Sequence, residues 1–323
     1  MKKYDFTVFG CATSVTVLKV DTLPEEGKTV WVNNTNVEPF NGGVGFNISA
    51  NLASLGARVH PVLSFSDNRL DEVIGKYVDN CGWPTDGLLK PVADSNRMCI
   101  MFQDNNLNHA TVMYRYGKNC DIKDADKLID KSIDYLSESK MVILASPRPK
   151  NTPIIFETLM ESNTPYVFSY RNDKTIFPPK ILHEIIKNAS MIFMNHAESL
   201  DLLKEFNVGS IDELFEISKL HTIVTTLGAE GCKIYHRENG KTEEIFVPIT
   251  KGPKGCVDGV GAGDAFLSGF MYGYINGKSL TLCGQYGSTM SSFAIEKEGS
   301  TTNIPTLEQM LERNASRPDA VFE

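Results

Sequence analysis

The sequence predicts an α/β fold with a mostly parallel sheet, helices on both of its faces, and a small accessory β-sheet. Short apolar segments of strand length alternate with longer amphipathic segments over most of the 323 residues, which is the pattern of repeated βαβ units. Two stretches, 13–36 and 97–115, break this rhythm and alternate in the strand manner, with turn signals at 24–27 and 104–108. These two stretches predict the accessory sheet.

The elements follow in order along the chain. The apolar segment 4–10 is too short for a signal peptide and contains Asp5, so it is interpreted as the first strand. Gly56 and Gly82 stand where the first two helices are expected to end. The expected strands are 4–10, 58–66, 141–146, 166–170, 191–195 and 221–228. The expected helices are 45–57, 68–82, 152–163, 179–189, 198–206, 211–220, 263–277 and 281–299.

The accessory sheet divides the chain into two parts. We assign residues 1–12, 37–96 and 116–323 to the main domain, and residues 13–36 and 97–115 to a β-lid. The lid is expected either to cover a site or to be the surface through which a homodimer forms, because an open sheet edge can pair with another strand. The tail 313–323 is predicted to be poorly ordered.

Composition excludes several classes of protein. The net charge is −8 with no basic run, which disfavours nucleic-acid binding. The sequence contains no run of about 18 apolar residues, so no membrane span is predicted. The seven cysteines are scattered without a C-x-x-C pair. They indicate reduced thiols in a cytoplasmic protein rather than a disulfide framework or a zinc site.

The segment DGVGAGDAF (258–266) places glycines directly before an expected helix. Free N–H groups and the positive end of the helix dipole make such a start an anion site. The spacing matches neither a P-loop nor a dinucleotide fingerprint. A simple turn in which Asp264 caps the helix remains the alternative.

Three further motifs occur in order before this one. In FNGGVGFN (40–47), Gly42 and Gly43 allow close backbone approach to a ligand, and Asn47 places an amide in the first helical turn; a tight loop is equally compatible. In NHAE (195–198), Asn195 and Glu198 follow a strand and could order Mg²⁺ and its waters, or form a helix cap. TTLGAEG (225–231) is either a hairpin or the edge of a nucleotide site.

Taken together, these motifs resemble the ribokinase-like, or PfkB-type, family of carbohydrate and nucleoside kinases over essentially the whole chain. DGVGAGD is similar to the family's D-T-x-G-A-G-D signature, and NHAE to its N-x-x-E motif. The resemblance implies a ribokinase-like three-layer α/β/α domain with a β-sheet lid. It also implies transfer of the γ-phosphate of ATP to a primary hydroxyl of a sugar or nucleoside.

The resemblance also implies roles for individual positions. Asp264 would be the general base, and the N–H groups of Gly261, Ala262 and Gly263 an anion hole for the transferring phosphoryl group. Asn195 and Glu198 would organise Mg²⁺ through water. Thr226, Gly228 and Gly231 would lie along the nucleotide, and Gly42, Gly43 and Asn47 along the acceptor. In some relatives a monovalent cation stabilises the loops that correspond to 296–305.

Three departures from the family pattern concern mainly the acceptor. The aspartate that usually grips two sugar hydroxyls falls on Val15, with Thr13 or Thr16 as possible substitutes, and Gly259 replaces the usual threonine of the signature. Arg97 stands where many sugar kinases have Thr-Gly. Arg97 and Arg148, with Arg171 as a further candidate, favour an anionic acceptor such as a sugar phosphate or a sugar acid, unless they are solvated surface charges. A non-catalytic binding protein is the third hypothesis, and Asp264 argues against it.

Overall fold

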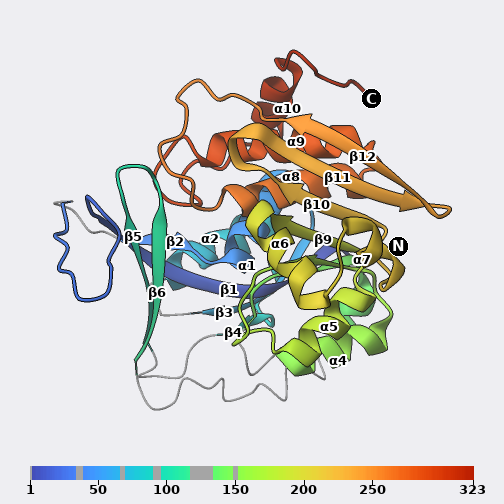
Figure 1. Ribbon diagram of the computed structural model, residues 1–323, viewed down its shortest axis with the longest axis horizontal. Helices are drawn as coiled ribbons and strands as arrows, with labels where there is room; N and C mark the ends of the chain where they lie inside the picture. Colours follow the sequence, from blue (N-terminus) through green and yellow to red (C-terminus); the bar gives the residue numbers. More distant parts are fainter. Residues whose placement is uncertain (1, 34–38, 66–69, 90–95, 117–133, 148–151) are drawn as a thin grey trace.

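The computed structural model describes residues 2–33, 39–65, 70–89, 96–116, 134–147 and 152–323 (Figure 1). It confirms the predicted alternation of strands and helices. The strands are β1 (Tyr4–Lys19), β2 (Phe40–Gly42), β3 (Val59–Phe65), β4 (Leu88–Leu89), β5 (Asn96–Gln103), β6 (His109–Tyr116), β7 (Ser139–Leu144), β8 (Tyr166–Ser169), β9 (Met191–Asn195), β10 (Thr222–Thr226), β11 (Gly231–Glu238) and β12 (Lys241–Pro248). The helices are α1 (Val44–Ser54), α2 (Leu70–Cys81), α4 (Thr152–Ser162), α5 (Pro179–Asn188), α6 (His196–Phe206), α7 (Ile211–Glu216), the 3₁₀ turn η2 (Gly228–Glu230), α8 (Ala262–Ile275), α9 (Leu280–Ala294) and α10 (Leu307–Ala315).

The main sheet has the strand order β12-β11-β10-β9-β8-β7-β1-β3-β4. Neighbouring strands in the series β4-β3-β1-β7-β8-β9-β10 are parallel. At the other edge, β11 pairs antiparallel with both β10 and β12. The sheet is therefore mostly parallel, as predicted. Parallel strands end at the same edge, so the loops after β8, β9 and β10 gather there, where open α/β sheets bind ligands.

Helices cover both faces of this sheet because its strands are apolar on both sides (Figure 1). In β9, Ile192 and Met194 face one core cluster, which includes Leu182 of α5 and Leu202 of α6. Met191 and Phe193 face the other cluster, which includes Ile48 of α1 and Phe270 of α8. Because successive side chains of a strand point to opposite faces of the sheet, the strand contributes side chains to both cores. The three-layer α/β/α arrangement is confirmed.

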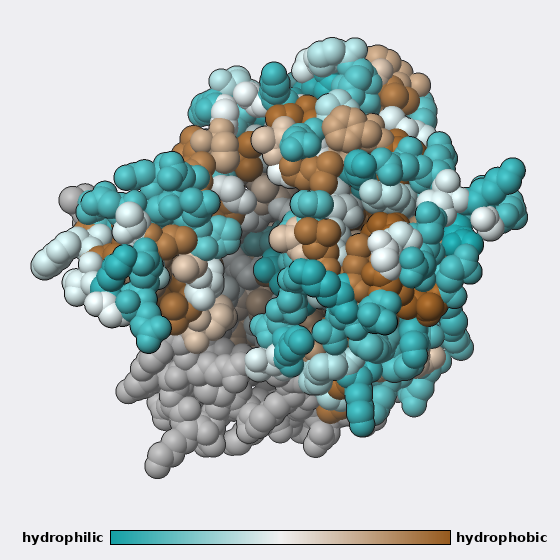
Figure 2. All heavy atoms as spheres, in the orientation of Figure 1, coloured by the Kyte–Doolittle hydropathy of each residue, from teal (hydrophilic) through white to brown (hydrophobic). Residues whose placement is uncertain are grey.

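The accessory sheet grows out of the first strand. Residues 6–12 of β1 pair with β3 in the main sheet, and Thr13–Val15 continue into pairing with β2. Further along, Val15–Lys19 pair with β5, which forms an antiparallel hairpin with β6. Figure 1 shows this hairpin standing off the main sheet, and Figure 2 shows the surface hollowed between the hairpin and the main body. The domain boundaries themselves remain a prediction.

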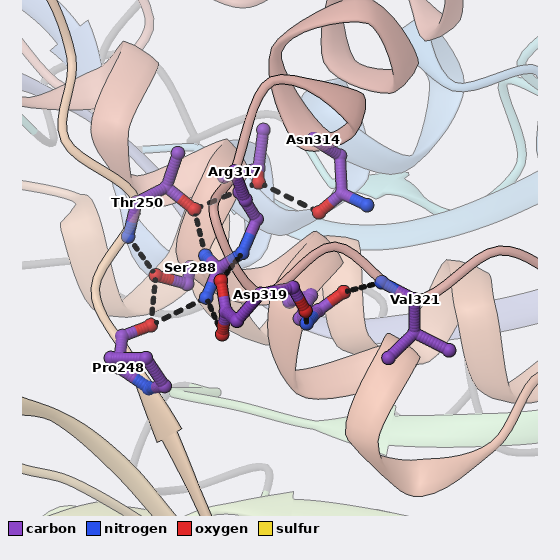
Figure 3. A network of polar contacts seen from close by, with 9 residues as sticks. Pro248, Thr250, Ser288, Asn314, Arg317, Asp319 and Val321 are labelled. Carbon is purple, nitrogen blue, oxygen red and sulfur yellow. Dashed lines mark hydrogen bonds and ion pairs between the residues drawn. The ribbon is translucent and has the colours of Figure 1, made fainter.

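The prediction of a poorly ordered C-terminal tail is wrong. Arg317 is buried, and its guanidinium donates to both carboxylate oxygens of Asp319 (3.0 and 2.9 Å) and to the carbonyl of Pro248 (2.9 Å). It also bonds Thr250, whose hydroxyl contacts Thr289 of α9 (Figure 3). The arginine thereby ties the tail to the end of β12, an interaction that sequence position alone did not indicate.

Within the described part of the chain, no helix is long and apolar enough to cross a membrane. The cysteines that the structure describes are all free thiols, namely Cys11, Cys81, Cys99, Cys232, Cys256 and Cys283.

Candidate active site

Two helix starts and the loop 298–301 meet around Asp264. Gly261 precedes α8 in the left-handed conformation (φ 81°), and a Cβ on it would lie 2.5 Å from Cβ of Ser300. Gly43 likewise precedes α1 with φ 98°, and a Cβ there would lie 2.6 Å from the carbonyl oxygen of Cys11. Glycine is required at both positions, because a side chain would be strained and would clash. These glycines bring the starts of α1 and α8 together.

Asp264 is the third residue of α8, and only 7 % of its side chain is exposed. Asn47 Nδ2 donates to Oδ2 of Asp264 over 2.7 Å, and a guanidinium nitrogen of Arg171 lies 3.7 Å from Oδ1. Burial raises the pKa of Asp264 above its ordinary value, while Arg171 and the bond from Asn47 act in the opposite direction. A carboxylate tuned in this way, with one oxygen near a partly exposed cation, is suited to accept a proton.

The start of α8 presents backbone N–H groups beside this carboxylate. The first i→i−4 bond of the helix runs from Ala265 N to Gly261 O (2.9 Å), so the N–H of Gly263 precedes the helical ladder. Ala262 N donates over 3.3 Å to Gly259 O and closes the turn. Gly263 is exposed, whereas Gly261 and Ala262 are half-buried. The arrangement can hold an anion at the positive end of the helix dipole.

Asn195 and Glu198 form a capping box at the start of α6. Asn195 Oδ1 accepts from Glu198 N, and Glu198 Oε2 accepts from Asn195 N, both over 2.8 Å. The sequence allowed two interpretations, a Mg²⁺ site or a helix cap, and the structure shows the helix cap. Burial raises the pKa of Glu198; Arg171 opposes this shift, and the charge on Asp264 adds to it. Glu198 therefore shares one electrostatic environment with Asp264.

The residues expected along the nucleotide lie at the adjoining strand ends. Thr226 is the last residue of β10 and pairs in register with Asn195 of β9. Gly228 and Gly231 flank the turn to β11, which pairs antiparallel with β10, so TTLGAEG forms a hairpin at the sheet edge. A Cβ on Gly231 would lie 2.1 Å from Val247 O, which explains a glycine there.

Of the residues expected along the acceptor, Gly42 pairs with Thr13, and Asn47 donates to Asp264. Val15 lies in an apolar cluster with Val17, Cys99 and Met101, against which Val260 of the glycine loop packs. This face of the lid is therefore apolar where the family resemblance implied an aspartate. Thr13 is buried on the same strand, and its hydroxyl donates over 3.5 Å to Ser14 O.

The three arginines expected to bind an anionic acceptor differ in how much of them the structure describes. Arg148 lies outside the described residues, and of Arg97 the backbone in β5 is described, with register partner Arg115, but not the side chain. Arg171, the third candidate, lies at the site beside Asp264 with 46 % of its side chain exposed.

Sequence reasoning missed several polar residues around the glycine loop. Ser300 Oγ donates to Asn47 Oδ1 over 3.0 Å, and Asp258 accepts from Gln103 of the lid over 3.1 Å. A clear signal existed only for Asp258, which is the first residue of the glycine motif. In the described part of the chain, no group of three or more His, Cys, Asp or Glu side chains could hold a metal ion by itself.

Two known kinases are similar to this chain over most of its length. The chain is 24 % identical over 297 residues to a nucleoside kinase of Methanothermobacter thermautotrophicus, covering 92 % of this chain and 91 % of that one. It is 22 % identical over 286 residues to a 5-dehydro-2-deoxygluconokinase of Listeria innocua, covering 83 % and 85 % of the two chains.

The fold is shared with a solved ribokinase. The structure of ribokinase from Cryptococcus neoformans var. grubii serotype A in complex with ADP matches with a TM-score of 0.76 and 23 % identity, over 96 % of this chain and 100 % of that one. The model of the pfkB family carbohydrate kinases matches residues 8–307. The chain therefore belongs to the pfkB family of carbohydrate kinases and is a phosphotransferase that acts on hydroxyl groups.

Proposed function

We propose that this kinase transfers the γ-phosphate of ATP to a primary hydroxyl of a sugar or nucleoside, with Asp264 as the general base. The observation that carries the proposal is the position of the buried Asp264 carboxylate in the first turn of α8. There it is held by Asn47 at 2.7 Å, next to the backbone N–H groups of the glycine loop. Transfer of a phosphoryl group to a hydroxyl requires a base next to a site that binds the phosphoryl anion.

In this mechanism each group has one task. Asp264 takes the proton of the acceptor hydroxyl as the oxygen attacks the γ-phosphorus, whose bond to the bridging oxygen breaks so that ADP leaves. Backbone N–H groups of Gly261, Ala262 and Gly263 stabilise the charge on the transferring phosphoryl group. Thr226, Gly228 and Gly231 lie along the nucleotide, while Gly42, Gly43 and Asn47 lie along the acceptor. Arg171 opposes the rise in the pKa of Asp264 that burial causes.

ATP and Mg²⁺ are the cofactors of this proposal. The ADP in the related ribokinase structure supports the choice of nucleotide. Mg²⁺ usually keeps several waters and binds through phosphates and one or two protein oxygens. This preference favours contact with Asn195 and Glu198 through water over a site made only of protein ligands. Glu198 caps α6 through Oε2, and its second oxygen can accept from a Mg²⁺-bound water. A monovalent cation near 296–305 remains part of the proposal.

The test is a screen of ATP consumption over nucleosides, pentoses, hexoses, sugar acids and sugar phosphates, with detection of the phosphorylated product. The name of the M. thermautotrophicus relative favours a nucleoside as the acceptor. Absence of phosphorylated product from every acceptor at catalytic enzyme concentration would contradict the proposal.

A second candidate is a sugar-acid or sugar-phosphate kinase, which Arg171 at the site and the resemblance to a 5-dehydro-2-deoxygluconokinase favour. In this case Arg97, Arg148 or Arg171 would bind the anionic group of the acceptor. Arg97→Ala should then raise the KM for the anionic acceptor about tenfold and leave that for ATP unchanged. An unchanged KM for the acceptor would remove Arg97 from this role.

We further propose that the protein acts in the cytoplasm and forms a homodimer through its lid. The lid exposes Val112 and Met113 of β6 (49 % and 56 %), and exposed apolar side chains on an open sheet are typical of pairing surfaces. Met113→Lys should convert the dimer to a monomer in analytical ultracentrifugation. A monomeric wild type would refute the dimer.

A further inference from the structure

One buried carboxylate connects the lid to the glycine loop without belonging to the catalytic groups proposed above. Asp258 is 2 % exposed, and Gln103, at the end of lid strand β5, is 1 % exposed. Gln103 Nε2 donates to Asp258 Oδ1 over 3.1 Å. A buried polar pair of this kind is costly to break, because each partner would be left without its hydrogen bond.

Asp258 also holds two backbone segments of the site. Oδ1 accepts from Val260 N over 3.1 Å, and Oδ2 accepts from Gly299 N over 3.0 Å. Gln103 and Val260 therefore share a single oxygen as acceptor. The same oxygen thus contacts both the end of lid strand β5 and the turn before Gly261.

The Gly299 segment carries the connection onward to the proposed base. Ser300, which follows Gly299, donates to Asn47 Oδ1 over 3.0 Å, and Asn47 donates to Asp264 over 2.7 Å. Thr301 donates to the carbonyl of Asn41 in β2 over 3.0 Å. These hydrogen bonds, joined by the peptide bond between Gly299 and Ser300, connect the lid to Asp264.

A lid lysine completes the lid end of this path. Lys19 is the register partner of Gln103, and its ammonium group bonds Gln103 Oε1. Lys19 also pairs with Glu298 over 3.2 Å, one residue before Gly299. Two strands of the lid are therefore attached to the 298–301 segment, β1 through Lys19 and β5 through Gln103 and Asp258.

We propose that Asp258 is a positioning residue that couples the position of the lid to the geometry of the glycine loop and of the Asn47–Asp264 pair. The proposal rests on the proposed function, because the coupled groups are those of the kinase site. When the lid is in place, Gln103 holds Asp258 and Asp258 holds both Val260 and Gly299. When the lid moves away, the shared oxygen loses a donor and both segments loosen.

The test compares the full-length wild type with Gln103→Leu, which keeps side-chain volume and removes the amide. Met101→Leu is the matched control, because Met101 lies on the same strand and packs in the apolar lid cluster. The first measurement is hydrogen–deuterium exchange of the amides in 259–263 and 298–301. We expect Gln103→Leu to exchange about tenfold faster in both segments, and Met101→Leu to exchange as the wild type does.

The second measurement is steady-state kinetics with an acceptor found in the screen. Gln103→Leu should lower kcat about tenfold and leave the KM for ATP within about twofold, since positioning rather than nucleotide binding is lost. Asp258→Asn is the second variant, in case Gln103→Leu does not fold, and the same two segments should loosen in it.

The outcomes separate the two proposals. Unchanged exchange in both segments, or equal acceleration in Met101→Leu, refutes the coupling. So does an unchanged kcat in Gln103→Leu. If the segments loosen as expected but the wild type phosphorylates no acceptor, the coupling of the loops stands and the proposed kinase reaction fails.

Discussion

Asn47 and Asp264 are separated by 217 positions in the sequence, yet Asn47 Nδ2 lies 2.7 Å from Oδ2 of Asp264 and both side chains are buried. Each residue is in the first turn of its helix, α1 or α8. The bond therefore aligns two helix starts, one on the proposed acceptor side and one at the glycine loop. It also leaves Oδ1 of Asp264 oriented toward Arg171.

Asp264→Asn should abolish most phosphoryl transfer while ATP still binds. The amide cannot accept the hydroxyl proton, and general-base catalysis contributes about 10²–10⁴-fold to a rate. We expect kcat to fall by that factor and the dissociation constant for ATP, measured by calorimetry, to change less than about threefold. Asp201→Asn, which neutralises a surface carboxylate bonded to Asn172, is the control and should retain full turnover. Turnover of Asp264→Asn at the wild-type rate would exclude Asp264 as the base.

Arg171→Ala should shift the pH dependence of the reaction. The guanidinium lowers the pKa of Asp264 and thereby opposes the effect of burial, so its removal moves that pKa further upward. The base is active when ionised, and activity is lost as the pH falls through this pKa. The acidic limb of the kcat/KM profile should therefore move to higher pH, with Arg171→Lys in between. An acidic limb in Arg171→Ala that coincides with the wild type would show that Arg171 does not act on Asp264.

His60 should make the stability of the protein sensitive to acid. The ring is fully buried and stacks on Tyr135 at 4.0 Å. Burial lowers its pKa to about 4, partly opposed by Asp86, compared with 6.5 for a free side chain. The unfolded chain thus binds more protons between these values, and stability decreases as the pH falls from about 6.5 to 4, by on the order of 3 kcal/mol.

His60→Phe keeps an aromatic ring at this position and removes the titrating group. Urea unfolding at pH 7 and pH 5 should show a smaller loss of unfolding free energy in this variant than in the wild type. His109→Phe makes the same change at an exposed site and should leave the wild-type pH dependence intact. Equal losses in His60→Phe and the wild type would exclude His60 as the cause.

Arg317→Met should destabilise the whole domain although only six residues of the sequence follow it. Its guanidinium holds Asp319, Pro248 and Thr250 together from a buried position (Figure 3). The variant loses the hydrogen bonds that this buried cation donates to Pro248, Thr250 and the partly exposed Asp319, which costs about 3 kcal/mol. Arg58→Met, which removes a half-exposed partner of Asp5, should cost about 1 kcal/mol or less. Thermal unfolding of the three proteins measures the difference, and similar melting temperatures for Arg317→Met and the wild type would show that the tail is not anchored.

Much of the fold was predictable because it depends on local patterns. The short apolar runs of strands such as β9 and the glycines after α1 and α2 can be recognised in consecutive residues. The motifs containing Asp264, Asn195 and Gly43 were also identified from the sequence. For Asn195 and Glu198, however, the sequence allowed both a cap and a metal site, and the structure shows the capping box.

The remaining features depend on contacts between distant segments. The proximity of Asn47 to Asp264, the Gln103–Asp258 bond and the buried Arg317 each join residues that are separated by dozens to hundreds of positions or belong to different layers. The sequence by itself determined the layered α/β architecture, the order of its elements and the motifs of a carbohydrate kinase, because periodicity and turn residues act locally. Only the tertiary structure decided which polar side chains meet, because the free energy of pairing a buried carboxylate depends on donors that folding alone brings to it.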